Sequence, residues 1–557
     1  MKADILICSN AIFDSVSNQP FKGFIALSHN KIIKVGKGSY DEFIGENTKI
    51  FNLGDKLVMS GLIDSHIHFF MGAITSSKYI INTLINAFSE EECCEMVHDF
   101  AIKHPDFKRI IGIGWATTSW GDKPLPTKES LDNLPIDCPI YLISMDGHTI
   151  WLNSKGIEEL GIKPSDRKNL KSGDMPLNEE GEISGLLMEG EASSPFFLRF
   201  FTDFFEDELE DIILTALKSI THKGITSFCD LSPVGLNENR PGGHLIHIFD
   251  KVKNLINKNS MPCRMHFVSD LKHVEKGAEV EISAKSEFNN PKLQYLGLKA
   301  FADGVLSTYT SYLLQPYYDK LNTKGHLNMD KEIYLEKIKY SNNENLPVRI
   351  HATGDAAVHE MLNVFEKVND LREDNNNNNK HNKNKNIPNS IEHIEILNPK
   401  DIPRFRELNV IASMQPAHLI GDLKEKYSRL GKERVKWIYP YGSILKSGAT
   451  LSFSSDYPIV KIDPLRDITI ALTHKDPNNP NLDSNTNQAI SLHEILKAYT
   501  IGGAHAINRS NELGTIEKGK IADLIIFNCN LFNCSIDEIN ESKVEMTIVD
   551  GSIVYKN

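Results

Sequence analysis

The two ends of the chain share a pattern of short, alternating apolar runs that is typical of β-strands. Residues 3–56 contain "ADILICSNAIF" and "GFIALSHNKIIKVG", with Asn and Gly at the breaks. The last residues repeat the pattern in "KIADLIIFNCN" and "VEMTIVDGSIVYKN", where Asp550 and Gly551 between two apolar runs predict a hairpin turn. The pattern therefore predicts one small sheet domain formed by both termini, from residues 1–56 and 513–557.

The middle of the chain, residues 57–512, alternates apolar strand-like runs with helical stretches, which is typical of a parallel sheet covered by helices. An eight-stranded barrel leaves two of the ten candidate strands for an insertion. The block from about 75 to 215 separates two otherwise closely spaced strands, and we predict that it is this insertion. The strand candidates are 61–68, 109–115, 139–148, 224–230, 262–270, 293–304, 346–355, 390–396, 409–418 and 449–456.

One segment of the middle region offers almost nothing that a core could bury. Residues 373–389, "EDNNNNNKHNKNKNIPN", consist mainly of Asn and Lys. Such a composition predicts a disordered surface loop, here between a helix and the next strand. His381 inside this tract is therefore not a candidate ligand.

Composition excludes several classes of function. A net charge of −13 without a basic stripe would repel a phosphate backbone, so we expect no nucleic-acid partner. No run approaches about 18 apolar residues, so we expect no membrane span, and the start lacks a signal-peptide core. The eight cysteines form no C-x-x-C pair and are thinly spread, which is typical of reduced thiols and predicts a cytoplasmic protein.

Polar side chains with metal-binding chemistry stand near the ends of several predicted strands. In a barrel of this kind, functional side chains lie at the carboxyl ends of the strands. The period of two in a strand places His66 and His68 on the same face, so both imidazoles can reach one ion. The full set of candidates is His66, His68, Lys299, His351, His393 and Asp456.

The alternative is that these are ordinary core or rim residues. A His-x-His pair alone is weak evidence, because a chain with 20 histidines contains such pairs by chance. A histidine at a strand end is often simply hydrogen-bonded to a neighbour. The ordered recurrence of His, Lys and Asp at the ends of separate apolar strands favours a metal site over that alternative.

The chain resembles the amidohydrolase superfamily, in "GLIDSHIHF", "DGHTIWLNS", "GLKAFADG", "HATGDAAV", "IEHIE", "ASMQPAH", "SSDYPI" and "LGTIEKGKIADLIIF". Within the superfamily it is most similar to the amidohydrolase 3 group, which contains YtcJ-like proteins and N-substituted formamide deformylases. The resemblance extends over nearly the whole chain. It implies a distorted (β/α)8 TIM barrel with an inserted subdomain, plus the small terminal β-sandwich. One departure is Ser60-Gly61, where the family has Pro-Gly.

The resemblance also implies a metal cofactor held by the six candidates above. Zn²⁺ accepts imidazole and carboxylate ligands, although other first-row divalent metals remain open. Lys299 is expected to be N6-carboxylated and to bridge two ions, with His66 and His68 on one and His351 and His393 on the other. A mononuclear site beside an unmodified Lys299 is the alternative, so we expect one or two Zn²⁺ per chain.

The activity implied by the resemblance is hydrolysis of carbon–nitrogen bonds other than peptide bonds. A metal-bound hydroxide would attack a small linear amide, such as an N-substituted formamide or an N-acyl compound. Asp456 would bind the ion and transfer the proton, and His418 would support the developing oxyanion. His148, Gln415 and Asp303 are candidate substrate contacts, each with a packing, turn or ligand-orienting role as its alternative.

Two other functions stay open at this point. The same metal chemistry serves deaminases and cyclic amidohydrolases of the superfamily. A metal-free scaffold is a different class, and such a protein should have lost at least one ligand, whereas all of them are present. The physiological substrate and the oligomeric state, including a homo-oligomer, also stay open.

Overall fold

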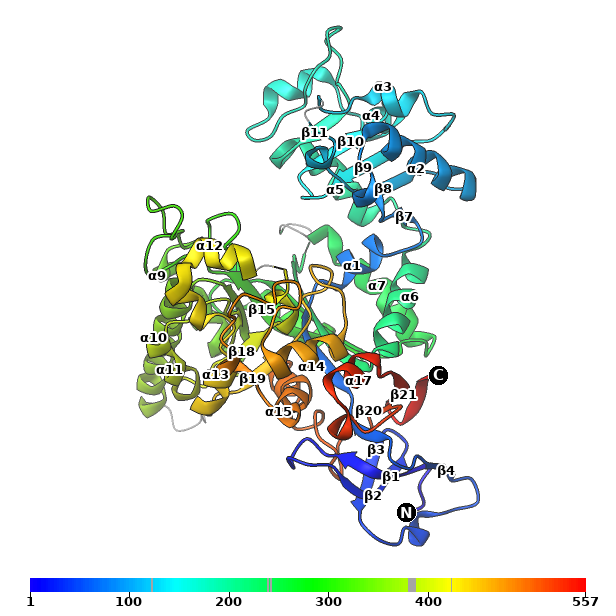
Figure 1. Cartoon of the computed structure of the whole chain (residues 1–557), viewed down its shortest axis with the longest axis vertical. Coiled ribbons are helices and arrows are strands. Elements are labelled where there is room, and N and C mark those ends of the chain that lie inside the picture. Colours follow the sequence, from blue (N-terminus) through cyan, green and yellow to red (C-terminus); the bar gives the residue numbers. More distant parts are fainter. Residues whose placement is uncertain (122–123, 238–239, 241–242, 379–386, 422) are drawn as a thin grey trace. The chain divides into compact units, whose positions relative to one another are not determined.

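The computed structural model describes residues 1–121, 124–237, 240, 243–378, 387–421 and 423–557. The chain forms two units (Figure 1). The larger consists of Met1–Phe69, Leu217–Ile246 and Val252–Asn557, and the smaller of Phe70–Ala216 and His247–Lys251.

The larger unit contains eight parallel strands that form a nearly closed barrel, which confirms the predicted fold class. Most positions of these strands are buried, which explains why they appear in the sequence as almost continuous apolar runs. Each corresponds to one of the predicted strand runs. In order of pairing they are β6 (Leu62–Ile67), β12 (Ile225–Val234), β13 (Arg264–Asp270), β15 (Leu293–Phe301), β16 (Val348–Ala352), β17 (Ser390–His393), β18 (Ile411–Met414) and β19 (Leu451–Phe453); the two-residue β14 (Asn289–Asn290) pairs with β15 outside this series.

Helices alternate with the barrel strands along the chain. Some begin with side-chain caps; Ser491 and Glu494, for example, form a capping box at the start of α15. The helices are α6 (Leu209–His222), α7 (Ile248–Asn257), α8 (Glu279–Glu287), α9 (Lys331–Asn343), α10 (Asp355–Asn378), α11 (Ile402–Glu407), α12 (Leu423–Arg434), α13 (Tyr441–Ser447), α14 (Pro464–Thr473), α15 (Leu492–Lys497) and α16 (Gly503–Ala506).

Helix α10 includes part of the predicted Asn-rich loop. The helix continues to Asn378, so residues 373–378 are helical rather than irregular. Residues 379–386 lie outside the described part of the chain, and residues 387–389 lead into β17 with Ile387 buried. The Asn residues after 373 extend a helix that begins in an apolar, well-packed segment, which sequence composition alone does not reveal.

The first and last barrel strands meet through contacts other than a regular ladder. The Ser65 and Ser452 hydroxyls lie 2.9 Å apart. The Asp456 amide donates to the His66 carbonyl at 2.8 Å, and the His68 amide donates to the Tyr457 carbonyl at 2.6 Å. These bonds bring the end of β6 beside the segment that follows β19.

Strands from both termini pair in one eight-stranded mixed sheet, shown in blue and red in Figure 1. β5 pairs with β1 in parallel and with β20 in antiparallel orientation, so it joins the two ends of the chain. The sheet's strands are β1 (Ile5–Phe13), β2 (Phe21–Ser28), β3 (Lys31–Gly36), β4 (Lys49–Asn52), β5 (Leu57–Ser60), β20 (Leu524–Phe527), β21 (Val544–Val549) and β22 (Ser552–Lys556), with α17 (Ile536–Glu541) between β20 and β21.

Two glycines of the predicted motifs, Gly551 and Gly61, stand where the backbone requires glycine. The β21–β22 hairpin turns at Asp550 and Gly551, whose φ angles of 52° and 70° match the type I′ turn predicted from this dipeptide. Gly61 links β5 to β6, and a Cβ there would lie 2.2 Å from the Thr226 hydroxyl. Glycine therefore allows the chain to pass directly from the terminal sheet into the barrel.

The smaller unit has its own five-stranded sheet and its own core. The two surplus strand candidates of the sequence are β8 and β9 of this sheet. Trp115, Trp120 and Trp151 pack together in its core. Its elements are β7 (Ile80–Ile81), α2 (Glu90–Lys103), β8 (Ile110–Trp115), α3 (Lys128–Asp132), β9 (Ile140–Ser144), β10 (Thr149–Leu152), α4 (Ser154–Leu160), β11 (Leu186–Met188) and α5 (Gly190–Thr202), preceded by α1 (Phe69–Thr75).

Within the described part of the chain, no helix combines the length and the apolar character needed to cross a bilayer.

A buried ion pair joins the barrel to the terminal sheet and provides a stability test. Arg264 of β13 is fully buried and donates to both oxygens of Asp523, at 2.8 and 3.0 Å, and also to Asp550. Arg264→Ala leaves the Asp523 carboxylate buried without its cation, so we expect a loss of about 3–5 kcal/mol in unfolding free energy.

Chemical denaturation measures this loss. Lys436→Ala, which breaks an exposed pair with Glu433, is the control and should leave the unfolding midpoint essentially unchanged. Equal midpoints for Arg264→Ala and the wild type would contradict the structural role of the pair.

Candidate metal centre

The six predicted ligands come from five barrel strands and line one cavity of about 490 Å³ in the larger unit. His66 lies in β6, Lys299 in β15, His351 in β16, and His393 ends β17. Asp456 follows β19, and His68 follows β6 by one residue. The convergence follows from the parallel barrel, because all strand ends of one polarity meet at the same rim.

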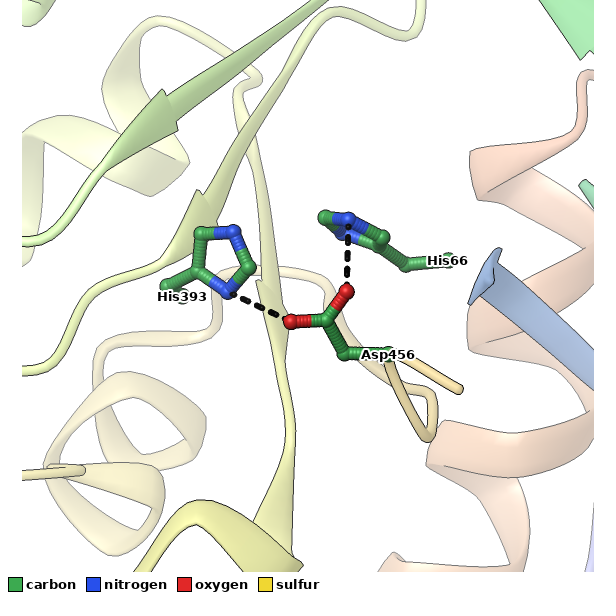
Figure 2. Close-up of side chains that lie close together, drawn as sticks. All are labelled: His66, His393 and Asp456. Carbon is green, nitrogen blue, oxygen red and sulfur yellow. Dashed lines mark ion pairs between the residues drawn. The ribbon is translucent and has the colours of Figure 1, made fainter. Parts of the chain in front are cut away.

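Asp456 stands between His66 and His393 (Figure 2). Its Oδ1 lies 3.4 Å from His66 Nε2 and 3.1 Å from His68 Nε2, and its Oδ2 lies 3.9 Å from His393 Nδ1. One ligand atom from each of His66, His393 and Asp456 falls within 4.8 Å of the others. This spacing suits three groups that share one cation.

Hydrogen bonds indicate which ring nitrogen of each histidine carries the proton. His66 Nδ1 lies 2.9 Å from a Glu392 oxygen, and His393 Nδ1 lies 3.0 Å from the Gln415 amide oxygen. Both oxygens can only accept, so each Nδ1 carries the proton and each Nε2 keeps its lone pair. In His351 the proton is on Nε2 instead, because this nitrogen donates to the Gly304 carbonyl at 3.0 Å.

The protonation states also fit a divalent cation. Burial, together with the charge of Lys299, lowers the pKa of His66 to about 3 and that of His351 to about 4. Burial would raise the pKa of Asp456, but the surrounding histidines hold it well below its usual value. Neutral imidazoles beside a carboxylate are the ligand forms that bind metal. Within the described residues, His66 Nε2 and Asp456 Oδ1 are buried without a hydrogen-bond partner, which is the state expected of ligand atoms.

Lys299 lines the same cavity, and its amine has no hydrogen-bond partner among the described residues. Its side chain is 1% exposed. Burial lowers the pKa of Lys299 to about 8, so a substantial fraction of the amine is neutral near physiological pH. The amine can therefore react or take part in metal binding.

His418, the predicted oxyanion support, lies in the 3₁₀ helix η8 (Pro416–Leu419) and lines the cavity. Its Nε2 lies 3.4 Å from Asp456 Oδ2, and its ring stacks parallel to that of His393 with centroids 5.8 Å apart. The structure thus places His418 beside the other site residues, as the sequence predicted.

The three predicted substrate contacts occupy different environments. Asp303 is buried, and its carboxylate accepts backbone hydrogen bonds from Tyr312, Thr353 and Gly354 at 2.8–3.0 Å, so it holds the loops behind His351. Gln415 is fully buried and orients His393. Neither is among the described residues that line the cavity. His148 belongs to the smaller unit, where it forms an exposed ion pair with Glu189 at 3.2 Å, and its contact with substrate stays a prediction.

Two ligands sit on strained backbone. His393 and Asp456 have φ angles of 74° and 61°, in the left-handed region that side chains other than Gly rarely adopt. Such conformations cost on the order of 1–3 kcal/mol each and persist at functional sites when the surroundings hold them. The surrounding strands therefore aim both side chains into the cavity at the expense of local stability.

Sequence reasoning missed Glu392 and Arg349, which lie directly behind His66. Both are fully buried inside apolar strands, Glu392 in "SIEHI" and Arg349 in "VRIHA". A charged residue inside a buried strand was the available signal, since such charges are normally paired.

A model of the amidohydrolase family matches residues 49–555 of this chain. The protein LONG AFTER FAR-RED 3 of Arabidopsis thaliana is 30% identical over 99% of this chain and 92% of its own length. The putative amidohydrolase YtcJ of Bacillus subtilis is 24% identical, covering 94% of both chains. The N-substituted formamide deformylase of Arthrobacter pascens is 21% identical over 92% of this chain and 90% of its own length. These matches confirm the resemblance inferred from the motifs.

Among solved structures, an uncharacterized metal-dependent hydrolase from Pyrococcus horikoshii has a similar fold. The TM-score is 0.75 at 23% identity, covering 96% of this chain and 99% of that one. At this level of identity the likeness concerns the fold.

Removal of the central carboxylate tests the site directly. Asp456→Asn keeps the side-chain shape but removes the negative charge that faces His66 and His68, so we expect the variant to lose most of its bound divalent metal. Metal per chain is measured by elemental mass spectrometry after dialysis. His359→Asn, at an ion pair with Asp401 outside the cavity lining, should retain wild-type metal. Full metal content in Asp456→Asn would contradict the assignment.

Proposed function

The chain belongs to the amidohydrolase family and is a metal-dependent hydrolase of carbon–nitrogen bonds, and from this premise we propose that it cleaves small linear amides. N-substituted formamides and other N-acyl compounds are the proposed substrates. The observation that carries the proposal is a cavity whose lining combines metal-binding and apolar side chains.

The apolar part of the wall suits the substituent of such an amide. A cavity of about 490 Å³ is of the size that binds small molecules. Phe301, Val305 and Ile459 line it although each remains more than one-third exposed, and Leu306 and Ile420 add to the same surface. An apolar N-substituent would cover this surface while the amide group lies beside the ligands.

We assign the cofactor as Zn²⁺, because imidazole and carboxylate ligands in this protonation state suit that ion. When bound, the ion supplies Lewis acidity, which polarises a carbonyl oxygen and lowers the pKa of water. The chain's own residues transfer the proton and stabilise the developing negative charge. Asp456 accepts the proton of the attacking water and delivers it to the departing amine nitrogen. His418 Nε2, buried without a hydrogen-bond partner in the described residues, donates to the oxygen on which negative charge develops.

Lys299 is proposed to carry a carbamate. Its neutral amine adds to CO₂ and releases one proton, which converts a neutral group into an anion with two ligand oxygens. The lowered pKa of Lys299 supports this step, because only the neutral amine is nucleophilic. The modification would allow His66 and His68 to serve one ion and His351 and His393 a second.

Substrate preference is the first test of this function. The zinc-loaded protein should release the primary amine from N-alkyl formamides, and kcat/KM should rise by up to about fourfold per added methylene as apolar surface is buried. Amine release is measured by chromatography, and Asp456→Asn is the inactive control. Release of ammonia from amidines, or opening of cyclic amides, without cleavage of any linear amide would contradict the proposal and favour a deaminase or a cyclic amidohydrolase.

Metal stoichiometry is the second test. Protein expressed with zinc and bicarbonate should contain two metals per chain, and Lys299→Ala should contain one or none. Lys426→Met is a matched control, because Lys426 is a second buried lysine of the same cavity but pairs with Glu395 at 3.1 Å. It should keep both metals. One metal in both the wild type and Lys299→Ala would establish a mononuclear site and refute the bridge.

A further inference from the structure

A fully buried ion pair lies directly behind His66. Arg349 of β16 and Glu392 of β17 stand on neighbouring parallel strands. Arg349 Nε donates to Glu392 Oε1 at 2.7 Å, and its Nη2 donates to Oε2 at 3.1 Å. Both residues have 0% exposure, so the pair lies inside the barrel and away from solvent.

Arg349 makes further buried hydrogen bonds. They reach the carbonyl oxygens of Ser65 at 3.1 Å and Ala506 at 3.3 Å. The Ser390 hydroxyl donates to Glu392 as well. The carboxylate is thus held on several sides, and it cannot rotate without breaking several buried hydrogen bonds.

The carboxylate oxygen that accepts from Arg349 Nη2 also faces His66. Glu392 Oε2 lies 2.9 Å from His66 Nδ1, and the carboxylate can only accept. The His66 proton therefore stays on Nδ1, and Nε2 points its lone pair toward Asp456.

Stability does not account for such a pair. Apolar residues of similar volume are often as stable as a buried ion pair, or more stable. The neighbouring histidines use neutral partners: His68 Nδ1 lies 3.0 Å from the Ser232 hydroxyl, and His393 Nδ1 bonds the Gln415 amide. The carboxylate charge is thus concentrated behind His66. There it makes the opposite ring nitrogen, Nε2, a stronger electron-pair donor to a metal ion.

We propose that Glu392, fixed by Arg349, is a positioning residue that orients His66 and strengthens its Nε2 as a metal ligand. The proposal rests on the metal-dependent function stated above. It concerns affinity for the ion rather than the choice of substrate.

The test replaces the pair without leaving a charge unpaired. Glu392→Met combined with Arg349→Met removes the acceptor and the cation together, so the apoprotein should unfold near the wild-type midpoint. The zinc dissociation constant, measured by competition with a chromophoric chelator, should rise about 10–100-fold. Glu392→Gln with Arg349→Met restores a neutral acceptor for His66 and should recover part of the affinity.

A second buried pair provides the control. Arg240 and Glu281 form an ion pair in which Glu281 is fully buried, and neither residue lines the cavity. Arg240→Met with Glu281→Met should leave the zinc dissociation constant unchanged. A wild-type protein that binds zinc while both Glu392 variants bind it within twofold of wild type would overturn the proposal. Failure of the wild type to bind zinc would instead refute the metal-dependent site itself.

Discussion

The closure between the first and last barrel strands is the contact on which the site depends. Asp64 of β6 accepts hydrogen bonds from the Ser455 amide and hydroxyl, at 3.0 and 2.6 Å. Beside this contact, the Asp456 amide donates to the His66 carbonyl. These bonds hold the only acidic ligand candidate among the six beside the His-x-His pair, although 390 residues separate His66 from Asp456 in sequence (Figure 2).

The arrangement of the site residues costs local stability. His393 and Asp456 hold left-handed backbone, and Arg349, Glu392 and Lys299 are charged or polar groups inside the barrel. Each feature costs free energy in isolation. Together they leave neutral imidazole nitrogens and a carboxylate aimed at one point, which reduces the reorganisation that ligand binding would otherwise require.

The sequence predicted those features that depend on local periodicity. All ten strand runs correspond to strands, the Asp550-Gly551 turn has the expected conformation, and the ligands at strand ends share one cavity. A parallel barrel makes the last point predictable, because it converts a position at a strand end into a position at a common rim.

Contacts between distant strands were not predictable in the same way. Gln415 follows β18 and suggested a substrate contact, yet its amide orients His393 of β17. Asp303 follows β15 in a similar position, but its carboxylate serves backbone amides of two loops. Glu392 precedes the candidate ligand His393, but the sequence alone does not predict its role. That role depends on Arg349 in the adjacent strand and on His66 across the barrel. Three-dimensional packing decides which residue of another strand a buried polar side chain contacts.

The most direct measurement is X-ray anomalous scattering at the zinc edge from crystals of the zinc-loaded protein. The account predicts a zinc peak inside the cavity, bonded to His66 Nε2 at about 2.0–2.1 Å and to the Asp456 carboxylate. Zinc bound only outside this cavity, with His66 and Asp456 in contact with each other alone, would contradict it.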